Sequence, residues 1–197
     1  MFFNCLSIKF DYTKYKESPH AYFPKTKNEL QTLIDKFYNN HEYNYNVIDV
    51  SRITDFSYLF SNKDLLYNIK IDKWDVSNGR NFSNMFSICN GFDADLSNWD
   101  VSNGINFMSM FGCCYAFNSD LSRWNVSKGE NFANMFYCCH SLETDFSNWD
   151  LSSVNINLPS IQTIDNMFKD VSKKSKLPKM YLEFKEQYAK GRELLPF

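Results

Sequence analysis

The chain has 197 residues, a formal net charge of −2, a hydrophobic fraction of 44% and an aromatic fraction of 18%. This hydrophobic fraction excludes a disordered chain, and the near-neutral charge gives no electrostatic reason to expect a nucleic-acid partner. No apolar run reaches the roughly 18 residues of a membrane-spanning helix, so no span is expected. The 19 Phe against 6 Gly and 5 Pro are unusual, and they indicate either a loosely organised chain or one built on a repeat.

Residues 1–44 are predicted to hold an N-terminal arm and a capping helix. Thr26 and Glu29 are three positions apart, as in a capping box. The apolar residues that follow share one helical face, so we expect a helix over 26–38 that covers one end of the repeats. The opening residues lack a basic leader followed by an apolar run and a cleavage site. We therefore expect an intracellular location, with the cell surface as the alternative.

Residues 45–171 are built on a 25-residue period. The four tryptophans, Trp74, Trp99, Trp124 and Trp149, are each 25 positions apart, and the Met-Phe pairs that begin at Met85, Met110 and Met135 follow the same period. Two markers on one period indicate a stacked repeat array. Five copies can be traced, of which the first and last are degenerate.

Each unit contains two apolar patterns, best seen in residues 95–119. The first has the spacing of a leucine-rich-repeat strand: Leu96, Trp99 and Val101. The second has the spacing of one helical face: Phe107, Met110, Phe111 and Cys114. The residue before each helical pattern is a good helix N-cap: Asp55, Asn81, Asn106, Asn131 and Thr163.

These patterns predict an α/β repeat fold. We expect a short leucine-rich-repeat-like solenoid of five units, each made of a strand, a turn and a short helix, with helical caps at both ends. The C-terminal cap is predicted within residues 172–197, as a helix that follows Pro178 and ends near Gly191. The same patterns predict that the apolar residues of both kinds form the core.

The repeat consensus W-[DN]-V-S-x-G-x-N-F-x-x-M-F-x-x-C resembles the repeats of BspA-like leucine-rich-repeat surface proteins. The resemblance covers roughly residues 45–171. Where that family usually has Val-Thr-Asn-Met, this chain has Gly79-Arg80-Asn81-Phe82 and equivalents, which indicates a divergent branch. The resemblance implies a repeat protein that binds other proteins or host surfaces, in a family most of whose members have no known activity.

The six cysteines are interpreted as reduced thiols that pack as small hydrophobes. Three share an inner repeat position, Cys89, Cys114 and Cys139, and two share the position beside it, Cys113 and Cys138. Disulfides between repeats remain an alternative, as does a metal site of Cys138, Cys139 and His140. Neighbouring cysteines chelate one tetrahedral ion poorly, and no C-x-x-C pair occurs, so we expect no metal.

No hydrolase, zinc-protease or nucleotide-binding motif is present, so we predict no catalytic residues and no cofactor. In a leucine-rich-repeat strand, the polar residues between the apolar ones face outward on a concave sheet. We predict that a protein partner binds there, at a polar and mostly acidic strip: Lys73, Asp75, Asn98, Asp100, Arg123, Asn125, Asn148 and Asp150. A fully solvated strip without a partner remains the alternative.

The sequence thus predicts a non-enzymatic, protein-binding repeat scaffold. The alternative is a surface-exposed adhesion or structural protein of the BspA-like type. Self-association through the ends of the stack stays open, and no nucleic acid or membrane span is expected.

Overall fold

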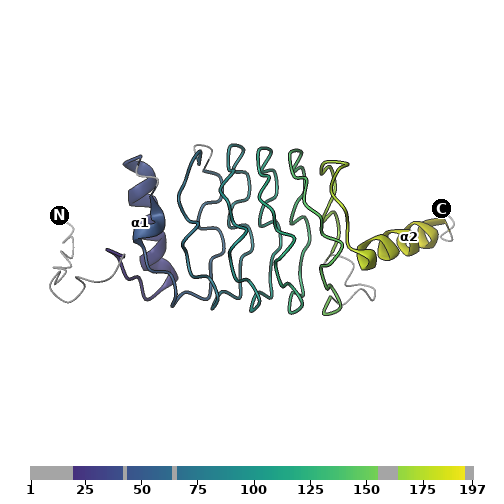
Figure 1. Ribbon diagram of the computed structural model, residues 1–197, viewed down its shortest axis with the longest axis horizontal. Helices are drawn as coiled ribbons and strands as arrows, with labels where there is room; N and C mark the ends of the chain where they lie inside the picture. The colour runs from purple at the N-terminus through teal and green to yellow at the C-terminus, as the bar shows by residue number, and fades with distance from the viewer. Residues whose placement is uncertain (1–19, 42–43, 64–65, 155–163, 194–197) are drawn as a thin grey trace, which may run out of the picture.

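The computed structural model describes residues 20–41, 44–63, 66–154 and 164–193. The molecule is an elongated row of stacked turns of chain, with helix α1 (Lys27–Asn39) along one end and helix α2 (Lys179–Glu193) projecting from the other (Figure 1). We call each turn of chain a coil. Parallel bridges keep equivalent residues in register. Following the repeat period, we number the described residues as coil 1 (44–63 and 66–69), coil 2 (70–94), coil 3 (95–119), coil 4 (120–144) and coil 5 (145–154 and 164–175).

The predicted α/β solenoid is wrong in its secondary structure. Apart from α1 and α2, the described residues form only a short 3₁₀ helix, η2 (Tyr45–Val47), and no β-strand. The segment 96–101, predicted as a strand, turns because the N–H of Trp99 donates to the carbonyl of Leu96 at 3.1 Å. The side chains of Asp95 and Asp100 each accept the N–H two residues further on. These local bonds replace the ladder that a strand needs.

The predicted short helix of each repeat is also absent. In coil 3, Ser109 and Cys113 have φ angles of 53° and 62°, and a left-handed residue at every fourth position prevents a right-handed helix. The N–H groups of Phe107, Ser109 and Phe111 donate to carbonyls of coil 4 at 2.8–3.0 Å, while the N–H of Met110 closes a turn on Phe107. The segment is therefore a run of tight turns that bonds alternately within its own coil and to the next.

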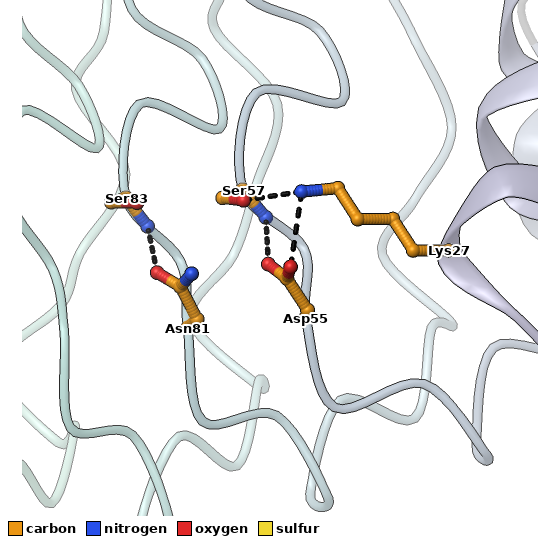
Figure 2. Close-up of polar contacts among 5 residues, drawn as sticks. All are labelled: Lys27, Asp55, Ser57, Asn81 and Ser83. Carbon is orange, nitrogen blue, oxygen red and sulfur yellow. Dashed lines mark hydrogen bonds and ion pairs between the residues drawn. The ribbon is translucent and has the colours of Figure 1, made fainter.

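Four of the five predicted N-cap side chains do accept a backbone N–H, but they begin a turn and not a helix. Asp55 accepts from the N–H of Ser57 at 2.9 Å, and Asn81 accepts from that of Ser83 at 3.1 Å (Figure 2). Asn106 and Asn131 make the same bond. Thr163 lies outside the described residues.

The core confirms both apolar patterns as buried positions. Leu96, Phe107, Met110, Phe111 and Cys114 have no exposed surface, and the equivalent residues of the neighbouring coils are buried with them. Phenylalanines at two repeat positions form two columns along the row, in which neighbouring ring centroids are 5.2–5.7 Å apart. Offset aromatic stacking stabilises such columns beyond simple burial, which explains why the chain contains so much Phe.

Helix α1 covers the free side of coil 1. Its N-cap is Thr26, whose hydroxyl accepts from the N–H of Glu29, as predicted. The Glu29 carboxylate reaches the N–H of Lys25 at 2.7 Å and not that of Thr26, so the capping box is shifted by one residue. Leu30, Ile34 and Phe37 are buried against the coil.

The polar residues of α1 are spaced to match coil 1. Lys27 pairs with Asp55 at 3.1 Å, Gln31 donates to the carbonyl of Leu59 at 3.2 Å, and Asp35 pairs with Lys63 at 3.0 Å. In this part of each coil, alternate N–H groups donate toward the C-terminal end of the row. Coil 1 therefore presents carbonyls on its free side, and α1 supplies a donor to one of them.

Helix α2 begins directly after Pro178, as the sequence predicts, and its first turns contact coil 5. The rings of Tyr181 and Phe168 meet edge to face at a centroid distance of 5.0 Å. Burial raises the pKa of Tyr181, and a hydrogen bond to the backbone of Phe168 opposes that shift. This end of the row thus uses a tyrosine hydroxyl to contact the backbone of the last coil.

Candidate functional site

The eight predicted partner-binding residues flank the four tryptophans. Each coil from 2 to 5 contributes the residue before its tryptophan and the residue after it. All eight side chains are exposed on the described surface: Lys73, Asp75, Asn98, Asp100, Arg123, Asn125, Asn148 and Asp150. We call them the tryptophan-flanking strip. They do not lie on a concave strand face, because the described residues form no sheet.

The tryptophans fix the strip to the core. The indole Nε1–H of Trp99 donates to the carbonyl of Ile71 in the preceding coil at 3.1 Å, and that of Trp124 donates to Leu96 at 3.0 Å. The tryptophans are at most 5% exposed. Because the side chain between each flanking pair is buried and hydrogen-bonded, neighbouring pairs keep a constant register from coil to coil.

The residue after each tryptophan has a structural role. Asp100 accepts the N–H of Ser102 at 3.0 Å through Oδ1, and Asp150 accepts that of Ser152 at 2.9 Å. Asp75 and Asn125 make the same contact. A side chain that closes a turn in this way is an Asx turn. Asx turns explain why this column is restricted to Asp and Asn.

The residue before each tryptophan varies in charge. It is Lys73 in coil 2, Asn98 in coil 3, Arg123 in coil 4 and Asn148 in coil 5, each with an exposed side chain. The side chains of Asn98 and Arg123 line one open hollow of about 450 Å³, which Asp93, Asp95 and Asp120 also line. The other six residues of the strip lie outside this hollow.

Sequence reasoning missed part of the lining of this hollow. Asp93 and Asn118 also line it, each two positions before one of the aspartates of the hollow. Asn118 lines the neighbouring hollow as well, together with Glu143. Asp93, Asn118 and Glu143 recur every 25 residues. That recurrence of polar residues was the signal that could have revealed them.

Hydrogen bonds hold two carboxylates of the hollow, Asp95 and Asp120, ionised. Hydrogen bonds from the backbone and side chain of Ser97 lower the pKa of Asp95, and those from Ser122 lower the pKa of Asp120. Hydrogen bonds from Ser102 likewise lower the pKa of Asp100. A carboxyl group with a lowered pKa is a poor general acid at neutral pH. The arrangement therefore suits the binding of cationic groups and hydrogen-bond donors better than acid–base chemistry.

The inner cysteines behave as the sequence predicts. Cys89, Cys114 and Cys139 are fully buried, and each thiol donates to a carbonyl of the preceding coil at 2.9–3.0 Å. No disulfide links the cysteines of the described residues, Cys89, Cys113, Cys114, Cys138 and Cys139. Cys5 lies outside that part of the chain.

The side chains of the alternative metal site diverge. Cys139 points into the core, the Cys138 thiol lies 3.9 Å from Asp170 Oδ2, and the ring of His140 stacks on Tyr115 at 5.2 Å. In the part of the chain that the structure describes, no three His, Cys, Asp or Glu side chains are placed to hold a metal ion. No described helix combines the length and apolarity that crossing a membrane requires.

Comparison with known proteins gives one family. Two matches to it cover residues 28–149 and 54–179, and their starts differ by about one repeat, as stacked equivalent units would produce. No curated protein and no solved structure matches the chain. The chain belongs to the family described as Mycoplasma protein of unknown function, DUF285.

Proposed function

We propose that this chain is a non-enzymatic scaffold that binds a protein partner through the tryptophan-flanking strip. One observation carries the proposal. Four exposed residues of differing charge, Lys73, Asn98, Arg123 and Asn148, stand at one repeat position on a frame that is otherwise constant. A rigid frame that presents variable side chains costs little ordering entropy on binding, and repeat proteins commonly bind through such surfaces.

The chemistry of the strip favours a partner of mixed charge. Ionised carboxylates at Asp95 and Asp120 lie in the same hollow as the guanidinium of Arg123. A partner that inserts a lysine or arginine near the carboxylates and a carboxylate near Arg123 would match this pattern, since charge complementarity confers specificity. The proposed location is intracellular.

Site-specific photocrosslinking tests this proposal. A benzoylphenylalanine at position 98 in the strip should crosslink one protein in cells that produce the chain, and Arg123→Glu should abolish that product. The matched control carries the same group at Tyr58, an aromatic residue that is 57% exposed and lies outside the strip. Equal crosslinking from both positions, or a product unaffected by Arg123→Glu, would exclude the strip as the binding surface.

A second candidate follows from the repeat consensus. Its resemblance to BspA-like repeats supports a surface-exposed adhesion or structural protein. Labelling of intact cells with a membrane-impermeant amine reagent separates the two candidates. Modification of exposed lysines such as Lys73 in intact cells would support adhesion, and modification only after lysis would support the intracellular scaffold.

A further inference from the structure

A second column of cysteines lies beside the inner one, on the outer edge of coils 3 and 4. The N–H of Cys113 donates to the carbonyl of Tyr137 at 2.7 Å, which places Cys113 in register with Cys138. Equivalent residues on neighbouring parallel segments are about 4.8 Å apart, which is within the roughly 4.4–6.8 Å between Cα atoms that a disulfide allows. The backbone therefore brings these two residues to bonding distance.

The two side chains interact and are reachable from solvent. Cys113 and Cys138 are both half-buried. Burial and the neighbouring Cys138 thiol raise the pKa of Cys113, and a hydrogen bond with Cys138 raises the pKa of Tyr137. The Cys138 thiol also lies 3.9 Å from Asp170 Oδ2.

The inner column provides the contrast. Cys114 and Cys139 have the same 25-residue spacing as the outer pair, but they have no exposed surface and their thiols donate to carbonyls of the preceding coils. Burial raises the pKa of both, as it also raises that of Cys113, so access from solvent and not pKa distinguishes the two columns. Because a small oxidant must reach a thiolate, register alone does not make the inner pair reactive.

We propose that Cys113 and Cys138 form a redox modification site, which low-molecular-weight disulfides convert to a disulfide between coils 3 and 4. One thiol loses its proton to solvent and its thiolate attacks the small disulfide, whose S–S bond breaks and whose released thiolate takes up a proton. The second thiol then deprotonates and attacks the mixed disulfide, which releases the second small thiol. Two electrons pass from the protein to the small disulfide.

Glutathione disulfide is the probe for this proposal. The folded chain, in a Cys5→Ser background, is incubated with it, acid-quenched, unfolded, alkylated and analysed by mass spectrometry. We expect two fewer alkylated cysteines than in the untreated chain, with no glutathione attached to the protein. We also expect a disulfide that joins two tryptic peptides, residues 81–123 and 129–169. Cys113→Ser and Cys138→Ser should each abolish the crosslink and retain at most one glutathione on the remaining outer thiol.

Two outcomes would overturn the proposal. One is a wild-type product with glutathione on both outer thiols and no crosslink. The other is a crosslink that persists in the Cys113→Ser/Cys138→Ser double variant, since it would then arise from the inner column. As a second measurement, the oxidised chain should unfold at a higher temperature than the reduced chain, and this difference should disappear in Cys113→Ser.

Discussion

The ammonium of Lys27 on α1 lies 3.1 Å from Oδ2 of Asp55 in coil 1, and it also donates to the hydroxyl of Ser57 (Figure 2). At the same repeat position, coils 2 to 4 have amides: Asn81, Asn106 and Asn131. Both residue types close the same turn, but carboxylates stacked in register would repel one another. The charged version occurs in the coil that lies against the helix, where a cation is available.

The first prediction separates the two roles of Asp55. Asp55→Asn keeps the turn and loses the ion pair, so we expect a loss of less than about 1 kcal/mol in the free energy of unfolding, as for partly exposed pairs. Asp55→Ala also loses the bond to the N–H of Ser57, and should cost about 1 kcal/mol more, as for a lost capping side chain. Urea denaturation measures both. Equal losses would mean that the turn contributes nothing.

The second prediction concerns the glycine three positions before Phe82, Phe107 and Phe132. A Cβ at Gly104 would lie 2.2 Å from Cζ of Phe107, whose ring is fixed between Phe82 and Phe132. Gly104→Ala should therefore destabilise the chain by about 1–3 kcal/mol, the usual cost of overpacking a core. Gly112→Ala is the control, because its nearest contacts would be at 3.5 Å. If thermal denaturation shows equal losses for the two variants, the steric explanation fails.

The third prediction concerns Ile88, a β-branched residue with φ of 60° and 47% exposure. Left-handed backbone is unfavourable for such a residue by roughly 1 kcal/mol or more, and Asn tolerates it far better. Ile88→Asn should therefore raise the free energy of unfolding by roughly 1 kcal/mol. The matched control is Ile105→Asn, a half-buried position outside the left-handed set, where we expect no gain. A gain at both positions would show that replacing an apolar side chain by a polar one, and not the relief of backbone strain, stabilises the chain.

The fourth prediction concerns pH. Hydrogen bonds from Lys176 and Ser147 lower the pKa of Asp145 from 3.8 to about 2, and the Lys176 ammonium lies 2.7 Å away. Because the folded pKa is depressed, this stabilisation is fully present above pH 4 and is lost as the pH falls through about 2. NMR titration of the Asp145 carboxyl should show its pKa rising in Lys176→Gln. An unchanged pKa in that variant would show that the lysine has no effect.

The sequence was sufficient for the period, the core and α1, but not for the backbone path. Apolar spacing records which side chains face inward. Phe107, Met110 and Phe111 do face inward, although the chain between them makes tight turns and not a helix. The decisive information lies in the polar residues between them: Ser109 adopts a left-handed conformation that ends any helix.

The sequence also contained a sign that the predicted strand would be replaced by turns. Asp95 and Asp100 are each followed two positions later by serine, and both pairs form Asx turns. An Asp-x-Ser sequence on each side of Trp99 therefore indicated two turns where the apolar spacing alone indicated a strand. For the strip, the sequence located exposed residues but could not show that Asn98 and Arg123 share a hollow with Asp93, because that depends on how neighbouring turns pack.

The direction of the hydrogen bonds between coils has an evolutionary consequence. In the segment of the stacked phenylalanines, each internal coil offers carbonyls toward the N-terminal end of the row and N–H groups toward the C-terminal end, and each helix contacts the group that coil 1 or coil 5 presents there. Inserting or deleting one whole 25-residue unit leaves both of these junctions unchanged. A gene of this kind can therefore lengthen or shorten its product by in-frame duplication or loss of a unit. Each event changes the number of variable side chains in the strip, while α1 and α2 still contact the two ends of the row.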